Sequence, residues 1–154
     1  MKVNKSVEQA IYVLIILALQ KDHAPVKSRV LSEILQVSDS YLKKILMVMK
    51  KNGLITSSAS KHGGYQLARS IEVISIKDVF DALNLSNEQL ELSHLAQHIF
   101  TDKEHTQQSE QKITHAFERA FASFYQELDQ FKLASLLKPA AYQNGAIDWN
   151  ARIK

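Results

Sequence analysis

The sequence predicts a mainly α-helical protein in which a winged helix-turn-helix unit precedes a long C-terminal helix. Three observations indicate this fold class. Two short stretches with helical apolar spacing are joined by a turn of three residues, 36–38. Short alternating segments on either side of a loop that ends in Gly63-Gly64 then predict a hairpin. Apolar residues at helical spacing recur over residues 107–131, which is more helix than one small domain needs.

The first helix is predicted to run from Ser6 to about Gln20. Ser6 and Gln9 have the spacing of a capping box, with Ser6 as the N-cap residue and Gln9 reaching back to it. The helix is apolar on nearly all sides, so neighbours are expected to cover it from several directions. Its apolar run, residues 10–19, is about half as long as a membrane span, and no signal-peptide cleavage site follows it.

A second helix is predicted over residues 27–35, and a third begins after Ser38 and stops at Asn52-Gly53. The third helix carries one apolar stripe, formed by Leu42, Ile45, Leu46 and Met49. Four lysines lie largely outside this stripe: Lys43, Lys44, Lys50 and Lys51. Two short helices joined this way form a helix-turn-helix, whose second helix enters the major groove of DNA. A lysine-rich helix face is more often simply solvated, so the elements before and after this helix must show whether it binds DNA.

Residues 54–57 and 65–68 are predicted as the strands of a hairpin, because apolar and polar residues alternate in them. The loop between them is small, polar and basic. It predicts a wing in which Lys61 and His62 reach phosphates or a minor groove beside the third helix. The alternative is an ordinary hairpin without DNA contacts.

The second half of the chain is predicted to be helical. Ser75 and Asp78 form a capping box at the start of a helix over 76–83. After them we expect a boundary at 84–87, a helix over 88–100, a polar run at 101–104, a long helix over 107–131 and a short helix over 131–137. The expected organisation is a DNA-binding domain at 1–84, a connecting and possible sensor segment at 85–106, dimerisation helices at 107–137 and a tail at 138–154.

The long helix carries an apolar stripe whose central members are Ile113, Phe117, Phe121, Phe124 and Leu128. Its 25 residues would span roughly 37 Å. Such a stripe must be buried. We expect the same helix of a second subunit to bury it, because most soluble oligomers are two-fold dimers. Packing within its own chain is the alternative.

Charge and composition narrow the functional classes. Residues 1–70 carry 11 Lys and Arg against 4 Asp and Glu, or +7, whereas residues 71–154 carry 8 against 12, or −4. A basic half favours a polyanion partner. The absence of cysteine fits a cytoplasmic protein and excludes thiol catalysis and cysteine-ligated metal. No nucleophile or acid–base pair stands in a recognisable frame, so an enzyme is not expected.

Several short motifs give the chain a resemblance to the Rrf2 family of bacterial winged-helix regulators. They are Val37-Ser38, Tyr41-Leu42, residues 50–55 (KKNGLI), residues 63–68 (GGYQLA) and residues 76–79 (IKDV). The resemblance covers about residues 1–137. It implies a dimeric, sequence-specific DNA-binding transcription regulator, usually a repressor, that dimerises through the long helix.

The sequence departs from the family pattern in two places. Cluster-binding members carry three cysteines before the dimer helix and this chain has none, which excludes cysteine-ligated iron–sulfur sensing. Members also tend to carry arginine and glycine early in the wing, where this chain has Ala59-Ser60, leaving Lys61 and His62 as substitutes for a minor-groove arginine.

The residues expected to bind DNA are Ser38, Ser40, Tyr41, Lys43 and Lys44 in the major groove, with Lys61 and His62 on the backbone. Ser40 and Tyr41 would contact bases and the lysines would hold phosphates. The second hypothesis is a helical dimeric interaction module whose basic half docks an acidic partner.

Three histidines, His94, His98 and His105, lie where cluster-binding members have cysteines. His94 and His98 are four residues apart and would share a helix face, which suits a metal. Ordinary surface histidines explain the same pattern, so no metal or other cofactor is expected. An effector, if there is one, would be a small molecule or a protein.

Overall fold

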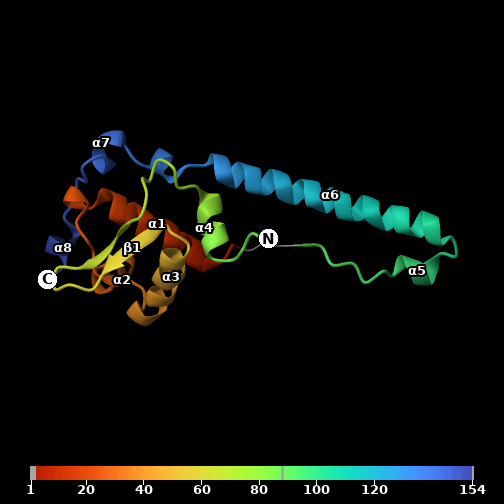
Figure 1. Ribbon diagram of the computed structural model, residues 1–154, viewed down its shortest axis with the longest axis horizontal. Helices are drawn as coiled ribbons and strands as arrows, with labels where there is room; N and C mark the ends of the chain where they lie inside the picture. Colours follow the sequence, from red (N-terminus) through yellow and green to blue (C-terminus); the bar gives the residue numbers. More distant parts are fainter. Residues whose placement is uncertain (1–2, 88, 154) are drawn as a thin grey trace.

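The computed structural model describes residues 3–87 and 89–153. A globular head holds both ends of the described chain, and a thin arm projects from it (Figure 1). We define the head as residues 3–87 and 124–153, and the arm as residues 89–123. The elements are, in order, α1 (Lys5–Leu19), η1 (Lys21–His23), α2 (Ser28–Leu35), α3 (Asp39–Lys51), β1 (Ile55–Ser58), β2 (Gly64–Leu67), α4 (Ile76–Ala82), α5 (Ala96–Ile99), α6 (Lys103–Gln130), η2 (Leu133–Leu136), α7 (Pro139–Tyr142) and α8 (Trp149–Arg152).

Helix α1 is the centre of the head, as its apolar sequence predicts. Ala10, Val13 and Leu14 are fully buried, and most of the helix lies in one core with α2, α3 and α4. The predicted cap is wrong, because the helix begins one residue before Ser6. Asn4 is the N-cap residue, its side chain accepts from the Ser6 N–H at 3.2 Å, and Ser6 is buried within the first turn. Asparagine caps helices as well as serine does, so the earlier residue prevails.

The helix-turn-helix is confirmed, and its turn shows how it forms without glycine. Gln36 takes the left-handed conformation, at φ 55°, and its N–H bonds back to the end of α2. A side chain without a branched β-carbon tolerates this conformation at some cost. Ser38 then caps α3 through the Tyr41 N–H, as the sequence predicts.

The hairpin is antiparallel, with Ile55 opposite Leu67 and Ser58 opposite Gly64. Both strands are confirmed, with boundaries shifted by one residue. Tyr65 also exchanges two backbone hydrogen bonds with Val26, of 3.0 and 2.8 Å, so the wing is fixed to the segment before α2. Gly64 is needed here because a β-carbon on it would lie 2.6 Å from the Val26 carbonyl oxygen.

The predicted helix over residues 88–100 is wrong. Glu88 lies outside the described residues, residues 89–93 have no regular structure, and only Ala96–Ile99 are helical. His94, with φ 58°, interrupts any helix through this segment. The apolar side chains here find little to pack against, so periodicity alone cannot hold a helix.

The long helix is confirmed but begins earlier than predicted, at Lys103. Asp102, in the polar run expected to be a break, is its N-cap and accepts from the His105 N–H at 3.0 Å. The Ser75–Asp78 capping box is present as predicted, and the predicted final short helix is the 3-10 turn η2. No helix among residues 3–87 and 89–153 combines the length and apolarity needed to cross a bilayer.

Candidate nucleic-acid interface

Helix α3 has one face in the core and one in solvent. Leu42, Ile45, Leu46 and Met49 are at most 5% exposed and anchor the helix against the rest of the head. The other face presents Ser40, Tyr41, Lys43 and Lys44, all exposed, together with Met47, which is 65% exposed. The buried stripe therefore fixes which side chains a ligand of this face can reach.

The first turn of α3 carries three hydroxyl groups. The Ser38 Oγ accepts from the Tyr41 N–H at 3.4 Å and lies 2.8 Å from the Ser40 Oγ. Ser38 is therefore largely occupied as the helix cap. Ser40 keeps hydrogen-bonding capacity beyond this contact, and Tyr41 is 42% exposed. Of the three hydroxyl residues predicted to face the major groove, Ser40 and Tyr41, the two predicted to contact bases, are therefore the more available for hydrogen bonds to a ligand.

The two lysines of this face differ in their partners. Lys43 Nζ lies 2.8 Å from Asp39 Oδ2. The hydrogen bond from Lys43 lowers the pKa of Asp39, and the same bond raises the pKa of Lys43. Lys44 has no ion pair within the part of the chain that the structure describes. Lys44 therefore offers an uncompensated charge, whereas that of Lys43 is partly neutralised.

Lys61 and His62 lie exposed at the tip of the wing, where the sequence places them. The structure brings them to the same hollow as Lys27, from the residues before α2, and Asn150, from the tail. From the sequence, Lys27 is predicted only as the start of a helix, and nothing in the tail indicates a position for Asn150.

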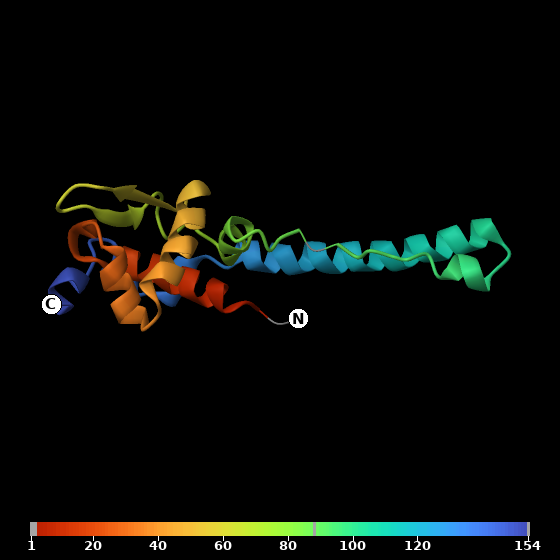
Figure 2. The same cartoon turned by 90° about the horizontal axis from the view of Figure 1, so that it is seen from below.

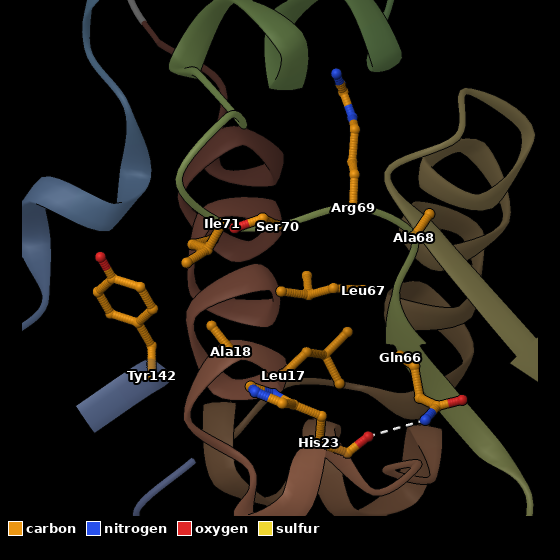
Figure 3. A pocket seen from close by; sticks show the side chains of 10 residues that line it. All are labelled: Leu17, Ala18, His23, Gln66, Leu67, Ala68, Arg69, Ser70, Ile71 and Tyr142. Carbon is orange, nitrogen blue, oxygen red and sulfur yellow. Dashed lines mark hydrogen bonds between the residues drawn. The ribbon is translucent and has the colours of Figure 1, made fainter. Parts of the chain in front are cut away.

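A second hollow, of about 380 Å³, lies where β2, the end of α1 and the tail meet (Figure 3). Its floor is apolar and includes Leu17 and Ile71. Gln66 Nε2 donates to the His23 carbonyl oxygen at 2.8 Å, and Arg69 extends away from the hollow to an ion pair with Asp78 at 3.0 Å. Its main polar groups thus serve the fold, holding the wing to η1 and to α4.

The predicted dimer stripe is divided by the structure. Ile113 and Phe117, in the arm, are 49% and 45% exposed. Phe121 is half-buried, and its ring lies 6.1 Å from that of Phe117. Phe124 packs edge-on against Phe80 of α4 at 6.0 Å, and Leu128 packs on the same core. The second half of the stripe therefore already has a partner in its own chain.

The three histidines are not brought together. His94 precedes α5, so it does not share a helix face with His98, and its Nδ1 lies 2.8 Å from Glu110 Oε2. His105 lies in the first turn of α6. Over residues 3–87 and 89–153, no three His, Asp or Glu side chains are placed to hold one metal ion.

Comparison with known proteins matches residues 3–139 to a family described as "Rrf2: Iron-dependent Transcriptional regulator". A Lactococcus lactis protein named as the HTH-type transcriptional regulator YffB is 41% identical over 83 residues, which cover 54% of this chain and 53% of that protein. The Bacillus subtilis protein named YwgB, also of HTH type, is 31% identical over 105 residues, covering 68% and 67%. The aligned part thus spans about half of the first relative and two thirds of the second.

Two solved structures share the fold. CymR, titled the global cysteine regulator of B. subtilis, has a TM-score of 0.65 at 19% identity, covering 88% of this chain and 95% of its own. IscR of T. potens has a TM-score of 0.65 at 24% identity, covering 98% and 96%. At these identities the likeness concerns the fold alone.

Proposed function

The chain belongs to the Rrf2 family of transcriptional regulators, and on this premise we propose that it is a homodimeric repressor that binds a dyad-symmetric operator. The exposed face of α3 carries the proposal. Its buried stripe holds the helix rigidly while Ser40, Tyr41 and Lys44 project into solvent beside a basic wing. A helix presented in this way suits the major groove, with its N-terminal residues toward the base edges.

We assign the contacts by chemistry. Ser40 and Tyr41 exchange hydrogen bonds with bases, and Lys44 holds a phosphate. Lys43 contributes less to DNA affinity than Lys44, because its ion pair with Asp39 partly neutralises its charge. Lys61 and His62 lie on the backbone or in the minor groove beside the wing.

The arm supports dimerisation. Helix α6 has 28 residues, roughly 42 Å, yet Thr106 is its only buried residue within the described chain. Ile113 and Phe117 remain about half exposed. The same helix of a second copy would cover these two residues together with Phe121. The resulting dimer would hold two DNA-binding heads for two half-sites about one helical turn apart. Repression follows from the family resemblance, since members are usually repressors.

Iron dependence, which the family description names, does not fit the residues of this chain. There is no cysteine for an iron–sulfur cluster, and among the described residues no three His, Asp or Glu side chains are placed to hold one metal ion. We propose that any effector acts on residues 85–106, between the head and the long helix, by favouring one spacing of the two heads.

The absence of iron dependence is tested by measuring DNA affinity with and without ferrous iron, zinc and manganese. The measurement is made for the wild type and for a variant in which His94, His98 and His105 are all replaced. We expect no metal response in either protein. A response in the wild type that disappears in the variant would make the chain a metal sensor.

The DNA-binding proposal is tested by selecting bound fragments from the source genome and measuring affinity against salt concentration. We expect Lys44→Ala to weaken binding to all duplexes and to lower the salt slope by about one per lost phosphate contact. Ser40→Ala should instead change the preference among sites, by about 1–3 kcal/mol for a lost base contact. Lys103→Ala, at the far end of the arm, is the control for loss of a positive charge. An unchanged affinity and salt slope in Lys44→Ala would exclude α3 as the recognition helix.

A further inference from the structure

The hollow beside the wing is lined by three separate segments. Lys27 comes from the residues before α2, Lys61 and His62 from the wing tip, and Asn150 from α8 near the C-terminus. The hollow measures about 430 Å³, and no carboxylate from the described residues lines it. Arg152, two residues after Asn150 in α8, does not line the hollow, and its guanidinium stacks on the Trp149 ring at 5.1 Å. The charge of the hollow comes from Lys27 and Lys61. The site is therefore positively charged and open to an anion.

Asn150 is held in this place by a well-defined docking of the tail onto α1. The side chain of Gln20, 2% exposed, accepts from the Trp149 N–H at 3.0 Å and donates to Asp148 Oδ1 at 3.4 Å. The Trp149 indole donates to the Ile16 carbonyl oxygen at 2.9 Å. Among the described residues, the buried Gln20 side chain is hydrogen-bonded by the tail alone, so the tail belongs to the head, because an unpaired amide there would be costly.

Gly145 permits this approach. Its φ is 71°, and a β-carbon at this position would collide with the backbone of Gln20. The tail can therefore cross the end of α1 only with glycine here.

The tail and the wing are fixed to the same short segment, residues 23–26. Gln66 of β2 donates to the His23 carbonyl oxygen, and the His23 Nε2 lies 3.0 Å from the Gln143 carbonyl oxygen. Asn150 Nδ2 donates to the Pro25 carbonyl oxygen at 3.1 Å. Figures 1 and 2 place α8 near α2, at the end of the head away from the arm, and Asn150 of α8 lines the same hollow as Lys61 and His62 of the wing. The tail thus lies next to the proposed DNA-binding elements.

We propose that this hollow binds a backbone phosphate of DNA, which makes the C-terminal tail part of the DNA-binding surface. The proposal rests on the proposed function. Lys27 and Lys61 supply charge, and the amide of Asn150 keeps a second N–H hydrogen after its bond to Pro25. Charged and amide donors of this kind are what phosphate oxygens meet in protein–DNA complexes, where they set the register of the protein without reading sequence.

The test uses two substitutions at Asn150, one of nearly equal size and one larger, at an exposed position outside the core. Asn150→Asp places a carboxylate in the hollow, and Asn150→Lys adds a positive charge. Asn144→Asp and Asn144→Lys make the same changes in the same tail at an exposed residue that does not line the hollow. Affinity is measured by fluorescence anisotropy as a function of salt, on a random-sequence duplex of about 30 base pairs, long enough for two half-sites.

We expect Asn150→Asp to weaken binding about tenfold or more, and Asn150→Lys to strengthen it and raise the salt slope by about one per site. The Asn144 variants should change affinity by about twofold or less, because Asn144 does not line the hollow and salt weakens an exposed charge that makes no direct phosphate contact. Equal effects at the two positions, in a protein that still depends on Lys44, would overturn the phosphate site and leave the DNA-binding function standing. A wild-type protein without salt-dependent affinity for any duplex would overturn both.

Discussion

The head and the arm of this protein bury their apolar side chains in different ways. In α3 the whole apolar stripe is at most 5% exposed, covered by α1 and the rest of the head. In the arm, Ile113, Phe117, Leu95 and Ile99 are between 45% and 70% exposed. The head therefore buries its core within one chain, whereas the arm leaves apolar side chains exposed, and we propose that a second copy covers them. Stability of the fold is expected to reside in the head, and assembly in the arm.

The contrast is sharpest on α6 itself. Phe117 and Phe124 are seven residues apart, so they lie on the same side of the helix. Phe117 is 45% exposed, whereas Phe124 contacts Phe80 of the head. One phenylalanine should therefore control association and the other folding.

The largest expected effect is that of Phe117→Asp on assembly. A buried, unpaired carboxylate at a dimer interface costs several kcal/mol, so the dissociation constant should rise by about a thousandfold or more. Sedimentation equilibrium at micromolar concentration measures this change, with Gln111→Asp, exposed and outside the stripe, as the control. If the variant still sediments as the wild type does, the arm is not the interface.

Phe124→Ala should act on folding. It removes the contact with Phe80 and leaves a partly filled cavity, at a cost of about 3 kcal/mol in the free energy of unfolding. Urea unfolding in the Phe117→Asp background isolates this effect, because association then plays no part. A loss below about 0.5 kcal/mol would mean that the stripe is not divided between head and arm.

Trp149→Ala should destabilise the head by about 2 kcal/mol. It removes a half-buried ring and the hydrogen bond from its indole to the Ile16 carbonyl oxygen. The same urea titration measures the loss, and Trp149→Phe, which keeps a smaller aromatic ring but not the N–H donor, should lose about half as much. If the tail contributed nothing to stability, both variants would have the same free energy of unfolding as the wild type.

The smallest effect concerns the response of the head to acid. Burial alone would raise the pKa of Asp78, but the Ser75 N–H and the Arg69 guanidinium outweigh it and hold the pKa below its usual value of 3.8. A carboxylate with a lowered pKa stabilises the folded state above its unfolded pKa, and this contribution is lost as the pH falls through the folded value.

Asp78→Asn should therefore be less stable than the wild type at neutral pH and should lose less stability as the pH falls below about 4. Urea titrations between neutral pH and the acid limit measure this, with Glu91→Gln in the arm as the control. Parallel pH profiles for the wild type and Asp78→Asn would show that this carboxylate does not stabilise the head.

The sequence alone determined the elements whose causes are local. Periodicity identified the buried stripe of α3, alternation identified the hairpin, and the spacing of Ser75 and Asp78 identified a cap that the structure contains. Each of these features depends on side chains within about four positions of one another, or on the two-residue period of a strand. The exposed, basic face of α3 could be predicted for the same reason.

The tertiary structure decided which apolar stripe meets which surface. Phe124 meets Phe80, and Trp149 reaches Ile16, through contacts that periodicity cannot specify because their partners lie 44 and 133 residues away. The helix expected at 88–100 failed for the converse reason, since a local pattern without a packing surface does not hold a helix. The hollow that unites Lys27, Lys61 and Asn150 exists only because the tail returns across α1, and that return depends on the burial of Gln20 and on Gly145, neither of which forms a local motif.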